Sequence, residues 1–153
     1  MKVRSGRSGQ FVGRTMRPNQ VAAVCYRHKG SSVQFLLVNT GGGKLTFPKG
    51  CVDHQLSAIE AASREAAEEA GVAGSIEQRA FASYLHVKKR ESQEFVVAAY
   101  LLRVRKAAFR PEAHRNPTWF PPQEAKKRLA KYRPRKYRDE LKRIVDRAVE
   151  RLR

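Results

Sequence analysis

Apolar and polar residues alternate near the start of the chain in a pattern that predicts two strands joined by a tight turn. The runs Val21–His28 and Val33–Thr40 are rich in Val, Phe, Tyr and Leu, and Gly30 lies between them. Strand-forming residues around a glycine-containing turn are typical of a β-hairpin. Two further runs of this kind, Ala80–Val87 and Glu94–Val104, are separated by a charged tip. The pattern therefore predicts two hairpins.

A helical period follows the first hairpin. In residues 57–70, Ser57 and Glu60 have the spacing of an N-terminal capping box, and Gly71 follows as a C-terminal stop. Apolar side chains recur every three to four positions, which predicts one buried stripe along this helix. The residues of this stripe are Ile59, Ala62, Ala66 and Ala70.

Two more helices are predicted at the C-terminal end. After a proline-rich stretch, residues 123–131 and 135–152 have helical periodicity, and the second carries a clear apolar stripe. Strands on both sides of a central helix, with helices at the end, predict one α/β domain over residues 20–153. Residues 1–19 contain five basic residues and no acidic one, with Gly and Ser between them, which is typical of a basic, mobile arm.

Composition and charge narrow the functional classes. The 153 residues include 32 Lys and Arg against 14 Asp and Glu, a net charge of +18 that favours polyanionic partners. No apolar run approaches the ~20 residues of a membrane span, and the N-terminal residues lack the apolar stretch of a secretory signal. Two cysteines are too few for a disulfide scaffold. We therefore expect a cytoplasmic protein of one domain that does not bind membranes.

The C-terminal segment concentrates this positive charge. Residues 126–153 contain 13 basic and four acidic residues. Such a segment is either an electrostatic footprint for RNA or another polyanion, or the solvated face of an amphipathic helix. The sequence leaves both interpretations open.

Three glutamates lie close together on the central helix. Glu65, Glu68 and Glu69 stand at positions i, i+3 and i+4, within an arc of about 100°. Uncompensated like charges at this spacing destabilise a helix, whereas oxygen ligands of this kind suit Mg²⁺ or Mn²⁺. Arg64 is four residues from both Glu60 and Glu68 and is placed to hold a carboxylate. Adjacent glutamates on an Ala-rich helix are usually only a solvated face. A longer pattern is therefore needed to decide between a solvated face and a metal site.

Residues 50–72 provide that longer pattern, because they resemble the Nudix box, G-x5-E-x7-R-E-U-x-E-E-x-G-U, in which U is a bulky apolar residue. Residues 47–50 are similar to the lead-in of diadenosine-polyphosphate and diphosphoinositol-polyphosphate hydrolases of this family, and residues 119–125 resemble its closing segment. Leu56 and Ala66 depart from the pattern at the first Glu and at the first U. The matching positions are Gly50, Arg64, Glu65, Glu68, Glu69, Gly71 and Val72.

The resemblance implies a fold and a reaction. The fold would be an α/β/α sandwich, a mixed sheet with the box helix on one face and the C-terminal helix on the other. The reaction would be Mg²⁺-dependent hydrolysis, with Mn²⁺ as a possible substitute, of a phosphoanhydride in a nucleoside diphosphate joined to another group or in a related polyphosphate. Dinucleoside and inositol polyphosphates are favoured. The implied metal ligands are the Gly50 carbonyl oxygen and the carboxylates of Glu65, Glu68 and Glu69.

Roles for individual residues follow from the same resemblance. Glu68 is the first candidate for the general base, with Glu91 or Glu94 as alternatives, and Glu69 and Arg64 complete the catalytic set. Apart from the resemblance, the candidates for binding substrate phosphates are Lys49, Lys44 and Arg90, and the alternative for each is a solvated cation of a loop or hairpin tip. The four histidines show no metal-ligand spacing among themselves, and Tyr84 is expected in the core.

Two rival functions remain at this stage. One is a catalytically weak Nudix-fold module that binds a ligand or RNA, in which Leu56 reports a relaxed site. The other is a pyrophosphohydrolase of RNA 5′ ends, which the basic C-terminal segment would serve. The sequence determines neither the substrate nor the oligomeric state.

Overall fold

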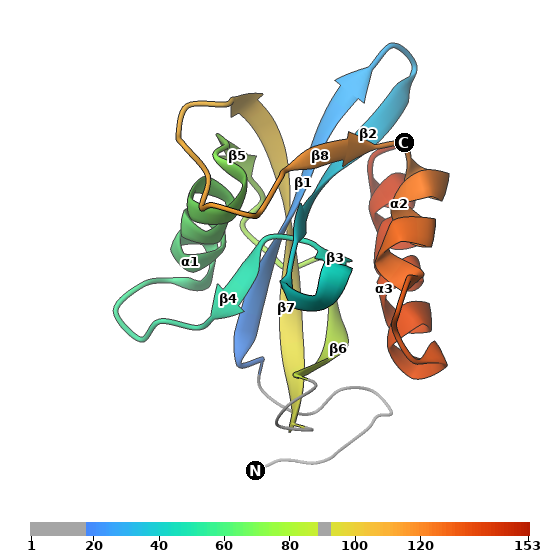
Figure 1. Cartoon of the computed structure of the whole chain (residues 1–153). Helices are drawn as coiled ribbons and strands as arrows, with labels where there is room; N and C mark the ends of the chain where they lie inside the picture. The colour runs from blue at the N-terminus through green and yellow to red at the C-terminus, as the bar shows by residue number, and fades with distance from the viewer. Residues whose placement is uncertain (1–17, 89–92) are drawn as a thin grey trace.

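The computed structural model describes residues 18–88 and 93–153. In this part of the chain a sheet lies between one helix on its first face and a pair of helices on its second (Figure 1). The expected α/β/α sandwich with a mixed sheet is therefore confirmed. Of the predicted N-terminal arm, residues 1–17 lie outside the described residues, and Asn19 pairs with β7 through its side-chain oxygen, which accepts from Val96 N at 3.0 Å.

The described strands form one sheet in the order β3-β2-β1-β7-β5, with β4 also paired to β1, β6 to β7 and β8 to β2. Strands β1 and β7 run parallel, and the other pairs are antiparallel. The strands are β1 (Gln20–Lys29), β2 (Ser32–Asn39), β3 (Leu45–Thr46), β4 (Lys49–Cys51), β5 (Ala73–Ile76), β6 (Ala82–Lys88), β7 (Gln93–Lys106) and β8 (Thr118–Phe120).

Both predicted hairpins are present, but four short strands, β3, β4, β5 and β8, are not predicted by the pattern. β4 and β5 each contain a glycine, and β8 lies in the proline-rich stretch, so their composition is typical of loops. They form because partners distant in the sequence supply the hydrogen bonds; Val21, for example, faces Gly50 in β4.

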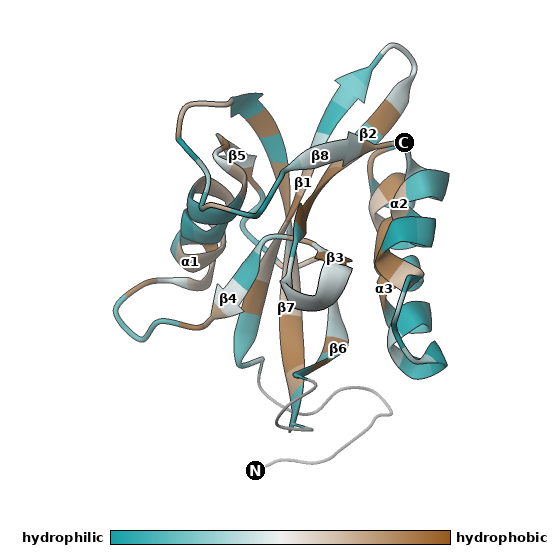
Figure 2. Cartoon of the chain, in the orientation of Figure 1, coloured by the Kyte–Doolittle hydropathy of each residue, from teal (hydrophilic) through white to brown (hydrophobic). Residues whose placement is uncertain are grey.

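The central strand β1 is buried on both faces. Ala22, Val24 and Tyr26 pack into one apolar cluster, whereas Val21, Ala23 and Cys25 pack into the other. Successive side chains of a strand point to opposite faces, so a strand apolar at every position needs cover on both sides. Figure 2 shows the apolar residues concentrated along the middle of the sheet.

The first face is covered by α1 (Ala58–Glu65), which continues as the π-helical turn η2 (Ala66–Ala70) and ends at Gly71 with φ +72°. The capping box is confirmed: Ser57 Oγ accepts from Glu60 N at 3.2 Å, and Glu60 Oε1 accepts from Ser57 N at 2.8 Å. The predicted buried stripe needs one correction. Ile59 is only half-buried, and Ala61 is fully buried, because the helix turns its alanine side against the sheet.

The second face is covered by α2 (Pro122–Ala130) and α3 (Arg135–Arg151). Their buried side chains include Leu129, Leu141 and Ile144, which join the cluster beneath Val24 and Tyr84. Among the described helices, none is both long and apolar enough to cross a membrane. The packing leaves the polar sides of α2 and α3 facing outward (Figure 2).

Candidate active site

Two of the three helix glutamates are buried, and the third is exposed. Only 9% of Glu65 and 6% of Glu69 is exposed, whereas half of the Glu68 side chain is accessible. The carboxyl groups of Glu65 and Glu69 interact closely, and each affects the pKa of the other. They flank the point where α1 changes to the π-helical turn, a kind of irregularity that is frequent at functional sites.

The acidic pair is electrostatically strained. Burial, followed by the negative charge of Glu69, raises the pKa of Glu65 to about 7. Burial also raises the pKa of Glu69, and the opposing charge of Arg115 reduces this effect. Burial thus disfavours the charged forms of both carboxyl groups, and a bound cation would favour them.

Strand β4 is pressed against this pair. A side-chain carbon on Gly50 would overlap the carboxylate of Glu65, so only glycine leaves that carboxylate its position. The neighbouring Lys49 N donates a hydrogen bond to Glu69 Oε1 at 3.1 Å. The glycine that opens the predicted box and the glutamates 15 and 19 residues later are thus brought into contact.

A cation that the sequence did not single out also binds the pair. Arg115 Nη2 donates to Glu69 Oε2 at 3.3 Å, and the same guanidinium bonds the backbone oxygen of Asn39 and the carboxylate of Glu112. Arg115 comes from the loop after β7, 46 residues from Glu69. No local spacing connects the two residues, so only the fold reveals this contact.

Arg64 and Glu68 lie at the outer edge of the acidic pair. Arg64 Nε is 4.0 Å from Glu68 Oε2, as predicted, but Arg64 Nη1 pairs with Asp53 Oδ2 at 3.1 Å. The predicted pairing of Arg64 with Glu60 is replaced by this one, since the carboxylate of Glu60 is used in the capping box. Asp53 thus anchors Arg64 from the loop that precedes the helix.

Leu56 occupies the position of the missing box glutamate. Its side chain is half-buried and packs against the apolar cluster beneath α1, together with Val52 and Ala58. The departure from the pattern therefore replaces a charged position with an apolar contact that fixes the loop on the helix.

The donor chemistry of the acidic cluster fits a hard divalent cation. In residues 18–88 and 93–153 no three His, Cys, Asp or Glu side chains converge as a ready-made metal centre. Glu65 and Glu69 do converge, with strained carboxylates, and Glu68 lies one helical turn from Glu65. Anionic oxygen donors with excess negative charge are the ligands that Mg²⁺ and Mn²⁺ take.

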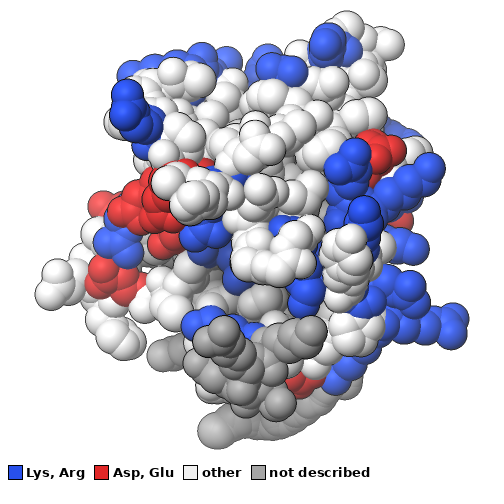
Figure 3. All heavy atoms as spheres, in the orientation of Figure 1, with Lys and Arg blue, Asp and Glu red and all other residues white. Residues whose placement is uncertain are grey.

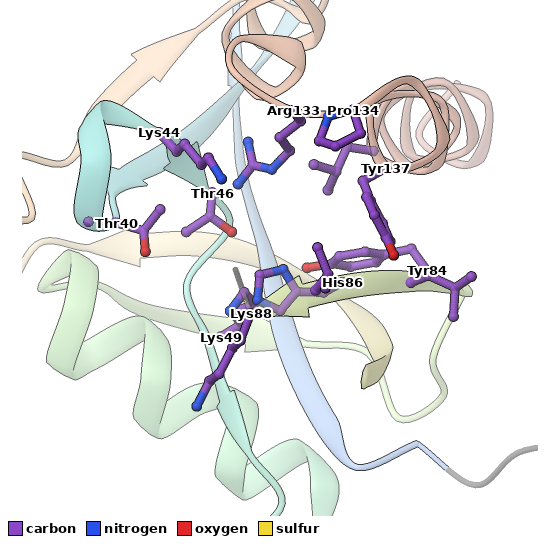
Figure 4. A pocket seen from close by; sticks show the side chains of 14 residues that line it. Thr40, Lys44, Thr46, Lys49, Tyr84, His86, Lys88, Arg133, Pro134 and Tyr137 are labelled. Atoms are coloured by element: carbon purple, nitrogen blue, oxygen red, sulfur yellow. The ribbon is translucent and has the colours of Figure 1, made fainter. Parts of the chain in front are cut away.

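A cationic pocket of about 340 Å³ opens beside this cluster. Lys49 joins the two regions, because its backbone bonds Glu69 and its side chain lines the pocket. Figure 4 shows side chains from β3, β4, β6 and the start of α3 directed toward one space. The polar lining comprises Thr40, Lys44, Thr46, Lys49, Tyr84, His86, Lys88, Arg133 and Tyr137.

Burial in the pocket disfavours the charged forms of its basic groups, as burial disfavours those of the two glutamates. Burial lowers the pKa of Lys49 to about 8, and the nearby Arg133 and Lys88 add to the effect. Burial, with the charges of Lys49 and Arg133 next, lowers the pKa of His86 to about 3. The hydroxyl of Tyr84, although buried, has no hydrogen-bond partner among the described residues. The pocket thus presents cations and neutral donors suited to an anion.

The remaining predicted site residues have different outcomes. Lys44 lines the pocket with Lys49, whereas Arg90 and Glu91 lie outside the described residues. The carboxylate of Glu94 accepts from Lys136 Nζ at 2.6 Å and from Tyr137 Oη at 2.8 Å, so it fastens β7 to α3. Glu94 is therefore a weak alternative to Glu68 as a base.

The comparison with protein families decides the identity of this fold. The sequence model of one family, described as the NUDIX domain, matches residues 16–141. The chain belongs to the Nudix family. With Glu65, Glu68 and Glu69 retained at the box positions, this membership makes the chain a Nudix pyrophosphohydrolase, an enzyme that hydrolyses phosphoanhydrides. No curated protein matches the sequence.

Solved structures of Nudix proteins share this fold at low sequence identity. A C. elegans Ap4A hydrolase is 21% identical, with 89% of this chain and 98% of that chain covered and a TM-score of 0.68. The NUDIX domain of Shewanella oneidensis NrtR, complexed with ADP ribose, is 20% identical, with 95% and 94% covered and a TM-score of 0.64. The Bacillus subtilis pyrophosphohydrolase BsRppH is 21% identical, with 88% and 82% covered and a TM-score of 0.59.

Proposed function

We propose that this Nudix hydrolase uses Mg²⁺, with Mn²⁺ as a substitute, to cleave a phosphoanhydride in a small polyphosphate, and that dinucleoside or inositol polyphosphates are its substrates. One observation carries the proposal: Lys49 links the strained glutamate pair to the strained cationic pocket. A phosphate chain held by the pocket would therefore extend to the carboxylates.

The acidic cluster would hold the metal. We assign Glu65, Glu68, Glu69 and the carbonyl oxygen of Gly50 as its ligands. A divalent cation bound there supplies charge neutralisation for the phosphates and lowers the pKa of a bound water. Gly50 leaves the Glu65 carboxylate the room it needs, and Arg115 with the backbone of Lys49 fixes Glu69.

The chain itself would move the proton. Glu68 is our candidate base, because its carboxylate is accessible at the edge of the acidic pair, with Arg64 Nε 4.0 Å away to orient it. Arg64 is in turn held by Asp53 at 3.1 Å. Arg64 therefore acts as a positioning residue, while Glu69 serves the metal.

The pocket would bind the rest of the substrate. Lys44, Lys49 and Arg133 offer charge-assisted hydrogen bonds to phosphate oxygens, and Arg90 remains a proposed fourth contact. The high positive charge of the chain suits substrates with several phosphates, since each one adds to the long-range attraction. The name of the C. elegans neighbour, an Ap4A hydrolase, supports a dinucleoside polyphosphate as the first substrate to examine.

A substrate panel tests the proposal. Wild type, Glu68→Gln and Glu69→Gln would be assayed with Mg²⁺, Mn²⁺ or a chelator on dinucleoside polyphosphates, inositol pyrophosphates, nucleotide sugars, nucleoside triphosphates and triphosphorylated RNA. We expect turnover of one small polyphosphate class that needs the metal and decreases roughly 10²- to 10⁴-fold in either variant. Glu150→Gln, which changes an exposed carboxylate on α3, is the matched control.

The same panel separates the rival functions. Preference for triphosphorylated RNA would favour the RNA 5′-end hydrolase. No turnover of any compound with either metal would favour the binding module and contradict our proposal. Wild-type rates in Glu68→Gln and Glu69→Gln would remove these two residues from the reaction.

A further inference from the structure

A second cationic depression lies outside the pocket, on the outer side of the two C-terminal helices. This groove has a volume of about 510 Å³ and runs between α2 and α3. Asp146 is the one acidic residue among the described lining residues, and it is paired with Lys126 at 2.8 Å. The space-filling view shows Lys and Arg crowded over the side of the molecule where α2 and α3 lie (Figure 3). The cations of the groove are Lys126, Lys127, Lys131, Arg133, Arg138 and Lys142.

An exposed aromatic ring stands in this groove. Tyr132 is 63% exposed, although an apolar ring of this size is usually covered. Its backbone is in the left-handed region, with φ +66°, where a non-glycine residue is uncommon. The ammonium of Lys131 lies 5.1 Å from the centre of the ring, so a cation accompanies the aromatic face. Tyr132 thus combines an uncommon backbone conformation with an exposed ring beside a row of cations.

The groove and the pocket share a lining residue. Arg133 lines both of them. A Cβ atom on Gly43 would lie 3.8 Å from the ring of Tyr132. Gly43 belongs to the turn Gly41–Gly43, and Gly41 of this turn lines the pocket. Phosphates bound along α2 and α3 would therefore lead to the mouth of the pocket.

We propose that the α2–α3 groove binds single-stranded RNA, with the phosphate backbone along Lys127, Lys131 and Lys142 and a base stacked on Tyr132. Cations that follow a backbone, interleaved with an aromatic face, are the usual device for holding a single strand. An inorganic polyphosphate has no planar group to stack. Exposed single-stranded segments are the ordinary targets of RNA-binding proteins, and the side-chain amide of Gln123 in the groove is suited to a ribose 2′-hydroxyl.

Binding of a labelled 12-nucleotide RNA with a 5′-hydroxyl tests the groove without the hydrolytic reaction. Fluorescence anisotropy across salt concentrations should give a slope of about −3 in log K against log salt, as for roughly four phosphates. The triple variant K127Q/K131Q/K142Q should bind roughly 10- to 100-fold more weakly. Its slope should be less steep by about 2, that is, about −1. Tyr132→Asn keeps a residue that tolerates the left-handed backbone, and it should weaken binding roughly 10-fold with an unchanged slope.

A charge-matched control makes the result specific. K29Q/K106Q/R110Q removes the same charge from exposed positions away from the groove and should bind RNA much as wild type does. Salt-insensitive binding, or equal affinities of the two triple variants, would overturn the proposal. Equally tight binding of poly-glutamate or of single-stranded DNA would also overturn it, in favour of an acidic protein or of a DNA strand. Hydrolysis of the small polyphosphate should be unchanged in K127Q/K131Q/K142Q, so failure of the groove and failure of the proposed reaction are distinguishable.

Discussion

The acidic pair and the cationic pocket are neighbours on β4, yet they are strained in opposite directions. On the helix side, burial and a like charge raise the pKa of Glu65 to about 7. On the pocket side, burial and like charges lower the pKa of Lys49 to about 8. Neither group compensates the other fully, although the backbone of Lys49 bonds Glu69 at 3.1 Å. The difference supports our proposal that the site takes two ligands of opposite sign, a cation and a phosphate chain.

The largest effect short of removing a carboxylate is expected from Gly50→Ala. Its new methyl group would displace the Glu65 carboxylate, which lies at the end of a flexible side chain. We expect kcat to decrease roughly 100-fold, since a displacement of about 1 Å has this effect in active sites. The melting temperature should change little, because the side chain can move aside. A large loss of stability with unchanged kcat in the folded fraction would contradict this account.

Substitution of a cation in the pocket should change KM rather than kcat. Arg133→Gln removes a cation that lines the pocket, and loss of a charged hydrogen bond to phosphate should raise KM roughly 10- to 100-fold. Arg135→Gln, two residues along and 85% exposed at its side chain, is the control with the same change of charge. Steady-state kinetics on the best substrate of the panel measures both. If Arg133→Gln lowered kcat with KM unchanged, the separation between the two regions would be wrong.

Removal of the carboxylate that anchors Arg64 should have a smaller effect on kcat/KM. Asp53→Asn removes the charge that holds Arg64 at 3.1 Å, and since both side chains are partly exposed we expect a two- to fivefold decrease in kcat/KM. Leu56→Glu, introduced into the Asp53→Asn protein, would offer Arg64 another carboxylate at the position where the Nudix box has one. Partial recovery in the double variant is expected. Wild-type kcat/KM in Asp53→Asn alone would show that Arg64 needs no anchor.

The pH dependence of stability gives the most delicate comparison. The pKa of His86 is about 3 in the folded protein and 6.5 in an ordinary environment. Between these values the unfolded chain binds a proton that the folded protein does not, so this residue lowers the free energy of unfolding as pH decreases. His86→Gln removes that contribution. Relative to wild type, the variant should therefore gain stability from pH 6.5 to pH 4, as measured by urea denaturation at several pH values. A difference that is constant with pH would contradict the assignment.

The sequence predicted the acidic half of the site far better than the cationic half. Glu65 and Glu69 are one helical turn apart, so their proximity follows from the helix alone. Which of the glutamates is buried did not follow, because it depends on Gly50 in β4. Arg115 and Arg133 reach the site from distant loops, and no local period relates them to the glutamates.

The fold shows the same division between local and distant information. The hairpins and helices were predictable, because alternation and capping are encoded within each element. β8 was not, because its strand pairing is supplied by β2, for example Leu36 opposite Trp119. Tyr84 was correctly expected in the core, but its unpartnered hydroxyl on the pocket wall could be recognised only from the folded structure.

The loop after β7 clasps the end of the glutamate-bearing helix. Phe109 N bonds Gly71 O at 3.1 Å, Glu112 N bonds Glu68 O at 2.8 Å, and Arg115 holds Glu69. Helix ends ordinarily fray, and amide protons there exchange first with solvent. In this protein, opening of the last turn would break these contacts, so we expect the two segments to unfold locally together. The loop therefore helps to hold the glutamates in place, mainly through its backbone and through the side chain of Arg115.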